Sequence, residues 1–322
     1  TEAATRYAVG TEPSDPETAR IFSTLAECRA LVVASGGALT SDFAVAALWP
    51  LCATVLVATA LGVPVLFSGV SVGPIAARDR DLVGAALATA TVVVVRDPVT
   101  SVGELEHLGI DPDRIVVAPD PALAAVPAPA DVVEAALEAA GVGAGAFAVV
   151  SLRDRPDPPE IGAIAALVAH LDGLGVPCLG VPHCADLSED DRRPLTVVAA
   201  AAPALRILDP MPPDDVIAGM SARAALAVGS RYHLIAFATA GGAPAIALVD
   251  GPYTERKAEG AAAFGPGPVT ILPVTVPTDT LIGAADAACI PAPTRPVAPL
   301  DVIAPALPAI ERFVGLLGSG RC

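Results

Sequence analysis

The segment AALAVGSRYHLIAFATAGGAPAIAL, residues 224–248, shows in one stretch the alternation that sets the fold. The apolar run 224–230 is typical of a buried strand, and residues 233–240 are typical of a helix that ends at a glycine pair. A second apolar run follows at 244–249. Because parallel strands are joined by a crossover, the segment predicts a strand–helix–strand unit with Ser230, Arg231 and His233 at its first corner.

The same alternation of short apolar runs and Ala-rich helical segments extends along the chain. It is typical of parallel sheets with helices on both faces, which predicts an α/β protein of two doubly wound, Rossmann-like domains that face a cleft. The predicted strands are 30–35, 64–69, 91–97, 115–119, 147–154, 176–182, 205–210, 224–230, 244–249 and 269–274.

A junction between the two domains is expected in residues 125–146, which begin Pro-rich and end Gly-rich. We therefore predict an N-terminal domain over 1–128 and a C-terminal domain over 129–322, with the last helix packing back on the N-terminal domain. A chain of 322 residues is long enough for two domains of ordinary size.

Composition excludes several classes of function. The chain has 19 Lys and Arg against 35 Asp and Glu, a formal charge of −16, which disfavours nucleic-acid binding. Its six cysteines form no CxxC pair, so neither a zinc ribbon nor a disulfide framework is expected. The polar, acidic N-terminus does not resemble a signal peptide, and we expect a cytoplasmic protein, at most close to the inner face of the membrane.

Residues 43–77 carry no charge, which raises the alternative of a membrane span. Pro50, Gly62 and Pro64 break this run, so we predict a buried helix, a turn, a strand and a loop instead.

Polar residues follow most of the predicted strands. Because ligands bind at the carboxyl ends of strands in open α/β sheets, we expect these residues to line the cleft. The helix start beside Arg231 also favours an anion there. The alternative is that Ser230 caps this helix while Arg231 pairs with a carboxylate such as Asp250.

Motifs for other chemistry are missing from the sequence. There is no Walker A loop, HExxH or GxSxG, and GVGAG at 141–145 precedes a strand, the wrong context for a dinucleotide site. Cys178, His183 and Cys184 lack a fourth zinc ligand nearby. We expect neither a metal nor a cofactor.

Seven ordered segments resemble the polysaccharide pyruvyl transferase family over roughly residues 30–260. It is their order and spacing that are specific. They are VVASGGALTSD (32–42), LGVPVLFSGVSVGP (61–74), VVVVRDPVTSVGELEHLGI (92–110), VVAPDPAL (116–123), AVVSLRD (148–154), the long run 208–248 and Lys257 shortly after it.

The resemblance implies a glycosyltransferase-B-like fold that moves the pyruvyl unit of phosphoenolpyruvate onto a lipid- or nucleotide-linked sugar as a cyclic ketal. It implies three groups of site residues. The catalytic residues are His233, Arg153 and Asp42. The donor-binding residues are Arg96, Arg153, Arg231, His233 and Lys257, and the acceptor-binding residues are Gly36, Gly37, Ser41, Asp42, Gly69 and Gly73. His233 suits acid–base chemistry because the ordinary pKa of a histidine is near neutrality, and a helix start beside it can favour the neutral form.

Each cation also has a purely structural interpretation. Arg96 could pair with Asp97, Arg153 with Asp154, and Lys257 could be solvated among its charged neighbours. Asp42 could cap a helix, and Asp120 before Pro121 is expected to be a turn residue. His183 is a weaker site candidate, and the acidic run 186–193 is expected to be a solvated helix start.

Two rival functions remain open. One is a sugar-nucleotide glycosyltransferase or epimerase of the same fold, because fold does not fix function. The other is a non-catalytic sugar-binding protein of envelope assembly. The glycine-rich unit with which family members usually open is not recognised before RYAVGTEPSDPETA, so the chain is expected to start late or to lack it.

Overall fold

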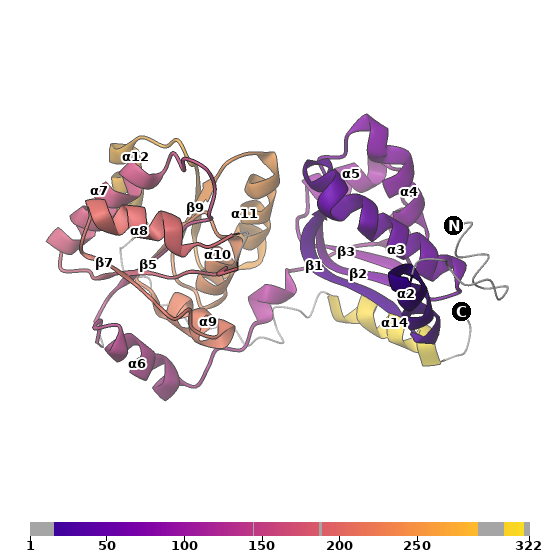
Figure 1. Cartoon of the computed structure of the whole chain (residues 1–322), viewed down its shortest axis with the longest axis horizontal. Coiled ribbons are helices and arrows are strands. Elements are labelled where there is room, and N and C mark those ends of the chain that lie inside the picture. The colour runs from indigo at the N-terminus through magenta and orange to yellow at the C-terminus, as the bar shows by residue number, and fades with distance from the viewer. Residues whose placement is uncertain (1–15, 144, 187–188, 289–305, 319–322) are drawn as a thin grey trace. The chain divides into compact units, whose positions relative to one another are not determined.

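The computed structural model describes residues 16–143, 145–186, 189–288 and 306–318, and it divides the chain into two compact units (Figure 1). Unit 1 extends to Pro121 and includes the C-terminal helix, and unit 2 begins at Ala122. The expected division after residue 128 lies a little further along the chain, directly before a helix of unit 2. Each predicted strand overlaps an observed one.

Unit 1 contains a parallel sheet in the order β1-β2-β3-β4. Its strands are β1 (Leu31–Leu39), β2 (Val65–Val72), β3 (Val92–Val95) and β4 (Ile115–Val117). All four residues of β3 are buried, as expected for a strand with helices on both faces. One face packs against α2 (Pro16–Glu27), α3 (Trp49–Ala60), α4 (Arg80–Ala88) and α5 (Thr100–His107).

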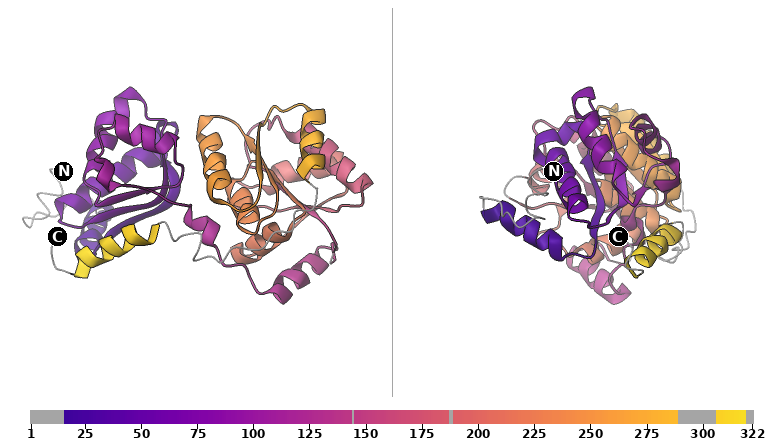
Figure 2. Two further views of the ribbon diagram at one scale, coloured as in Figure 1. Left: turned by 180° about the vertical axis from the view of Figure 1, so that it is seen from behind. Right: turned by 90° about the vertical axis from the view of Figure 1, so that its right-hand side faces the viewer.

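The other face of this sheet is covered by α14 (Leu307–Gly318), drawn in yellow in Figure 2. Phe313 of α14 is 2% exposed and packs with Leu66, Val92 and Val94. The C-terminal helix therefore completes the core of unit 1, although most of the chain between β4 and α14 belongs to unit 2.

The apolar run 43–77 breaks near the predicted places, into a helix that ends at Ala60, a turn, strand β2 and a loop. Residues 41–60 are long and apolar enough to cross a membrane, with a mean hydropathy of 2.0, and 33% of the tested window is buried. Cys52, Val55 and Ala58 point into the core of unit 1. This helix therefore contributes one face to the core.

Unit 2 contains a parallel sheet in the order β10-β9-β8-β5-β6-β7. Its strands are β5 (Ala148–Ser151), β6 (Cys178–Gly180), β7 (Leu205–Ile207), β8 (Leu226–Gly229), β9 (Ala245–Val249) and β10 (Val269–Pro273). The chain builds outward from β5 to β7 and then returns to the other side of β5 with β8. The strand order reverses between β5 and β8, which is where doubly wound folds bind ligands.

Both faces of this second sheet are covered by helices, each through its own apolar core. One face packs against α6 (Ala130–Ala139), α9 (Asp214–Arg223), α10 (Tyr232–Ala240) and α11 (Pro252–Phe264). The opposite face packs against α7 (Ile161–Gly173), α8 (Arg192–Ala201) and α12 (Thr278–Ala288). Unit 2 is therefore a complete doubly wound domain.

Candidate functional site

Two neighbouring strand ends in unit 2 build the candidate site. Ser151 at the end of β5 lies beside Gly229 at the end of β8, and the Ser230 N–H donates to the Ser151 carbonyl at 3.0 Å. A Cβ on residue 229 would lie 1.9 Å from that carbonyl oxygen, so only glycine allows the two strands to approach this closely. The residues that follow each strand are thereby brought together.

Ser230 fixes the backbone after β5 and does not cap the next helix. Its hydroxyl accepts a hydrogen bond from the Arg153 N–H at 3.0 Å and donates to Glu160 Oε1 at 3.3 Å. The N-cap residue of α10 is Arg231, whose side chain makes no capping bond. The alternative in which Ser230 caps this helix is therefore wrong.

Arg231 is held by two carboxylates. Its Nε donates to Asp191 Oδ2 at 2.8 Å, and its second nitrogen reaches Glu189 Oε1 at 2.7 Å. Burial would lower the pKa of Arg231, but hydrogen bonds and charge from Asp191, together with the Glu189 charge, outweigh it and raise that pKa. The alternative that Arg231 pairs with a carboxylate is therefore confirmed, but the partner is not Asp250, which pairs with Arg155 at 2.6 Å.

Asp191 is the fixed centre of this corner. Its carboxylate is fully buried and accepts the backbone N–H groups of Asp154, His183 and Cys184 at 3.2, 2.9 and 3.0 Å, besides binding Arg231. A carboxylate with this many donors is stable in the interior. The interpretation of residues 186–193 as a solvated helix start is wrong for Asp191.

Arg153 meets Arg231 at a single oxygen atom. Its Nε donates to Glu189 Oε1 at 3.1 Å, the same atom that Arg231 contacts. The alternative partner Asp154 binds Arg193 instead, at 2.8 Å. Two of the predicted donor-binding arginines, from the ends of different strands, therefore converge on one carboxylate.

His233 and Lys257 lie beside the same corner. His233 is exposed in the first turn of α10, with its ring centroid 5.5 Å from that of Tyr232. Lys257 on α11 places Nζ 4.9 Å from the centroid of Tyr232 and 5.1 Å from that of Tyr253, which are cation–π contacts. Tyr232 thus connects the predicted lysine to the predicted acid–base residue.

His183, another histidine of unit 2, lies in the loop after β6. Its Nδ1 lies 2.9 Å from Ser151 Oγ and 3.3 Å from the Val181 carbonyl. Because a carbonyl only accepts, we assign the ring hydrogen to Nδ1, which leaves Nε2 as a buried acceptor without a partner among the described residues. Burial, and then repulsion from His233, lower the pKa of His183 to about 3.

Arg96 has a different environment, within unit 1. It follows β3, is 2% exposed, and donates through Nε to Ser71 Oγ at 2.7 Å while its end pairs with Asp120. Asp97 instead accepts the Ser101 N–H at 2.7 Å near the start of α5. The alternative pair Arg96–Asp97 is therefore wrong, and Asp120 is more than a turn residue.

The residues predicted for the acceptor side all lie in unit 1. Gly36 and Gly37 are inside β1, which continues to Leu39, and Gly69 is inside β2 at a φ of 65°. A Cβ on Gly69 would lie 2.3 Å from Pro121 Cδ, so this glycine permits a close chain contact. The Gly73 N–H donates to the Leu39 carbonyl at 2.7 Å.

Ser41 and Asp42 differ in exposure and in contacts. Ser41 Oγ donates to Asp79 at 2.6 Å and accepts the Ala76 N–H at 2.8 Å, which gives it a structural role. Asp42 is exposed in a short 3₁₀ helix that is capped by Thr40, so the alternative of Asp42 as the cap is wrong.

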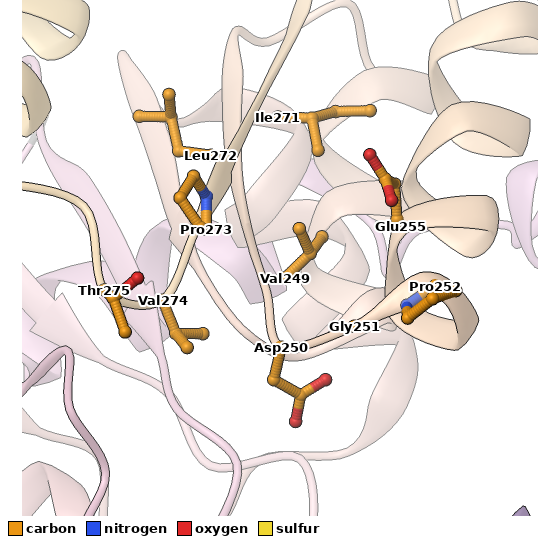
Figure 3. Close-up of a pocket in the computed structure, with 10 residues that line it drawn as sticks. All are labelled: Val249, Asp250, Gly251, Pro252, Glu255, Ile271, Leu272, Pro273, Val274 and Thr275. Atoms are coloured by element: carbon orange, nitrogen blue, oxygen red, sulfur yellow. The ribbon is translucent and has the colours of Figure 1, made fainter.

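A cavity of about 380 Å³ opens at the same edge of the unit 2 sheet, at the ends of β9 and β10 (Figure 3). It is lined by Val249, Asp250, Gly251, Pro252, Glu255, Ile271, Leu272, Pro273, Val274 and Thr275. Its charged lining residues are the carboxylates Asp250 and Glu255, which disfavour a phosphate there. The corner after β5 and β8, in contrast, has two arginines, Arg153 and Arg231, beside its carboxylates.

Comparison with known proteins gives the family. The family model for polysaccharide pyruvyl transferases matches residues 7–251. The chain belongs to this family. A search of the curated proteins finds no match.

Solved structures with a similar fold include several UDP-N-acetylglucosamine 2-epimerases. A putative UDP-N-acetylglucosamine 2-epimerase from Listeria monocytogenes superposes with a TM-score of 0.61 at 14% identity, covering 92% of this chain and 79% of its own. The MnaA–UDP structure from S. aureus gives 0.61 at 12%, covering 97% and 86%. The Neisseria meningitidis 2-epimerase bound to UDP-GlcNAc gives 0.56 at 12%, covering 94% and 83%. At this identity they show the fold, which is glycosyltransferase-B-like.

In this pyruvyl transferase family member, unit 2 gathers four predicted residues, Arg153, Arg231, His233 and Lys257. Arg96 and the acceptor-side residues belong to unit 1. Sequence reasoning missed Glu189, Asp191 and Glu160, whose carboxylates bind the arginines and Ser230 at this corner. The acidic run 186–193 was the one feature of the sequence that could have indicated Glu189 and Asp191. Arg153 and Arg231, which follow β5 and β8, each need a negatively charged partner, and this run supplies it.

Proposed function

We propose that the chain transfers the pyruvyl unit of phosphoenolpyruvate to two hydroxyl groups of a sugar, closing a cyclic ketal. The observation that carries the proposal is the convergence of Arg153 and Arg231 on one carboxylate oxygen where the strand order of unit 2 reverses. Phosphoenolpyruvate offers a carboxylate and a phosphate, and guanidinium forks bind both groups with matched geometry. Family membership supports the same reaction.

Lys257 and the first turn of α10 add to the proposed donor site. Lys257 lies over Tyr232, the neighbour of Arg231 and His233 in sequence. The N-terminal turn of a helix presents free N–H groups and a positive partial charge, both of which favour an anion. The donor would therefore meet two arginines, a lysine and a helix start in a single unit.

In the proposed reaction the methylene carbon of phosphoenolpyruvate gains one proton, and each of the two sugar hydroxyls loses one. Protonation of the methylene carbon makes C2 electrophilic, and the first sugar hydroxyl adds to C2. The C2–O bond to phosphate then breaks as the second hydroxyl adds. Of the two hydroxyl protons, one balances the proton gained by the methyl group and the other leaves with phosphate. His233, exposed beside the arginines, is our candidate for the proton transfers.

The acceptor is proposed to be a sugar of a cell-envelope glycan or its precursor, carried on a lipid or a nucleotide, with exposed Asp42 of unit 1 as a base toward its hydroxyls. Ser41 and the glycines at 36, 37, 69 and 73 would shape the backbone around it. No metal or further cofactor is needed in this scheme.

His233→Ala tests the proposal directly. Loss of acid–base catalysis should lower the rate of sugar-dependent phosphate release by about 10²- to 10⁴-fold. The assay measures phosphate released from phosphoenolpyruvate with a panel of sugars, and NMR of the product identifies the ketal carbon. His107→Ala, an exposed histidine in unit 1, is the matched control and should leave the rate unchanged. Near-normal turnover of His233→Ala would remove this residue from the mechanism.

A nucleotide-sugar reaction is the second candidate, because the structural neighbours include 2-epimerases determined with UDP-GlcNAc or UDP. The cavity beside Asp250 and Glu255 could take sugar or ribose hydroxyls, which carboxylates bind well. This candidate predicts that UDP-N-acetylglucosamine is epimerised when phosphoenolpyruvate is absent. Phosphate release that requires both phosphoenolpyruvate and a sugar would favour the first candidate.

A further inference from the structure

We infer that Glu189 is an internal competitor for the donor, and that its carboxylate occupies the position which an oxyanion of the substrate takes between Arg153 and Arg231. The inference rests on the proposed donor site and adds a residue that sets donor affinity.

One oxygen atom of Glu189 binds both arginines. Glu189 Oε1 lies 3.1 Å from Arg153 Nε and 2.7 Å from the terminal nitrogen of Arg231. The two guanidinium groups are therefore spaced so that one oxyanion oxygen touches both. Carboxylate and phosphate oxygens accept hydrogen bonds from guanidinium at these same distances, so either group of the donor could replace the glutamate.

The two carboxylates that bind Arg231 differ in burial and in their other contacts. Asp191 is 0% exposed and bound by three backbone N–H groups, so it cannot leave without exposing unpaired donors. Glu189 is 29% exposed, and its carboxylate binds the two arginines. Glu189 is therefore the partner that a ligand from solvent can displace, while Asp191 keeps Arg231 oriented.

Displacement of the Glu189 carboxylate needs only a rotation of its side chain. The Glu189 N–H donates to Asp186 Oδ1 at 2.8 Å, and its carbonyl accepts the Asp186 N–H at 3.0 Å. The Asp190 N–H donates to Asp154 Oδ2 at 3.0 Å. The backbone on either side of the glutamate side chain is thus anchored, and rotation about its side-chain torsions frees both arginines.

The charges at this corner favour replacement of the Glu189 carboxylate by a substrate oxyanion. With Glu189 in place, two guanidinium groups face the carboxylates of Glu189 and Asp191. When Glu189 rotates into solvent, the arginine pair keeps one fixed negative neighbour and carries an excess positive charge. A bound oxyanion restores the balance, and a dianionic phosphate does so more strongly than a carboxylate.

The test measures equilibrium binding of three probes to the full chain by calorimetry. The probes are phosphoenolpyruvate, inorganic phosphate and pyruvate, and the variants are Glu189→Gln and Glu189→Ala. Removing the competitor should tighten phosphoenolpyruvate binding by about fivefold, the size expected when partly exposed ion pairs, here with Arg153 and Arg231, are lost. Glu138→Gln, an exposed carboxylate on α6 of the same unit, is the matched control and should bind as the wild type does.

The two smaller probes identify the displaced group. A larger gain for phosphate than for pyruvate would place the donor phosphate at the glutamate position, and the reverse would place the donor carboxylate there. Either result supports the inference. Unchanged or weaker binding of all three probes to both Glu189 variants would overturn it, because it would show that Glu189 holds the arginines for the ligand.

The binding measurement tests the role of Glu189, and the activity measurement tests the proposed reaction, so each can be contradicted without the other. Tighter oxyanion binding by Glu189→Gln in a protein that releases no phosphate with any sugar would keep the internal competitor and remove the proposed reaction. Equal binding by Glu189→Gln and the wild type, in a protein with full transferase activity, would remove the competitor and keep the reaction. A large fall in kcat for Glu189→Gln would also overturn the inference, since it would make Glu189 a catalytic residue.

Discussion

Arg96 in unit 1 and Arg231 in unit 2 both follow a buried parallel strand, yet their surroundings differ. Arg96 is 2% exposed and its partner Asp120 is 1% exposed, so this ion pair is closed off from solvent. Arg231 is 18% exposed, and one of its two carboxylate partners, Glu189, is 29% exposed. An arginine after a strand can therefore belong to the core or to a site that a ligand can reach.

The difference shows that the exposure of the partner carboxylate, more than the position of the arginine, decides whether an anion from solvent can reach the ion pair. A buried ion pair is costly to break because either partner left alone is an unpaired charge in the interior. A partly exposed pair contributes little to stability and exchanges readily with solvent ions. This contrast leads to three stability predictions of decreasing size.

Asp120→Ala should give the largest effect. It leaves the buried guanidinium of Arg96 without this carboxylate, and breaking one side of a buried pair costs about 3–5 kcal/mol of the free energy of unfolding. Urea denaturation, followed by probes in unit 1, measures the loss.

Two variants control this measurement. Glu106→Ala, an exposed carboxylate on α5, should change the free energy of unfolding by less than about 0.5 kcal/mol. The double variant Arg96→Met/Asp120→Ala should recover much of the loss, because it removes both charges together. A loss below about 1 kcal/mol for Asp120→Ala would mean that Arg96 reaches solvent or another partner, and the contrast with Arg231 would fail.

His183 predicts a pH-dependent effect of intermediate size inside unit 2. Its folded-state pKa is lowered to about 3, chiefly by burial, from an ordinary 6.5. As pH falls below 6.5 the unfolded chain takes up a proton that the folded chain does not, so stability is lost progressively until about pH 3. Between pH 6 and 4 the loss should be about 2 kcal/mol.

The variant His183→Gln isolates this contribution because the other titrating groups stay the same. Its free energy of unfolding should change less between pH 6 and 4 than that of the wild type. His107→Gln, in which an exposed histidine is replaced, should follow the wild-type curve. Parallel curves for His183→Gln and the wild type would show that His183 titrates normally and that its buried nitrogen is accessible to water.

Most of the fold could be predicted from the sequence, because apolar runs of strand length alternate with helical segments throughout. Each predicted strand overlaps an observed one, and the segment 224–248 forms β8, α10 and β9. Strand order could not be predicted, since it depends on which helices cover which face. The packing of the last helix on the N-terminal domain was expected, but the sequence did not indicate which face of the unit 1 sheet it covers.

The positions of the positively charged residues of the candidate site could be predicted from the sequence, but those of the negatively charged residues could not. Arg153, Arg231 and His233 follow apolar strands, a position that parallel sheets make functional. Glu189 and Asp191 lie in an acidic run whose composition indicates a solvated surface. Their contacts join residues about 40 positions apart in the sequence, and no local pattern predicts such pairs. The same holds for the pairing of Arg96 with Asp120.

Glu189→Gln should give the smallest effect on stability. Its two ion pairs involve side chains that are 34% exposed for Arg153 and 18% exposed for Arg231, and pairs of this kind contribute about 0–1 kcal/mol. Arg231 keeps Asp191 as a partner, and Arg153 can turn to solvent, so no buried charge is left alone. Urea denaturation should therefore place this variant within about 1 kcal/mol of the wild type, with a difference that shrinks further in added salt. A loss comparable to that of Asp120→Ala would show that Glu189 is part of the core, in which case a substrate anion could not replace it.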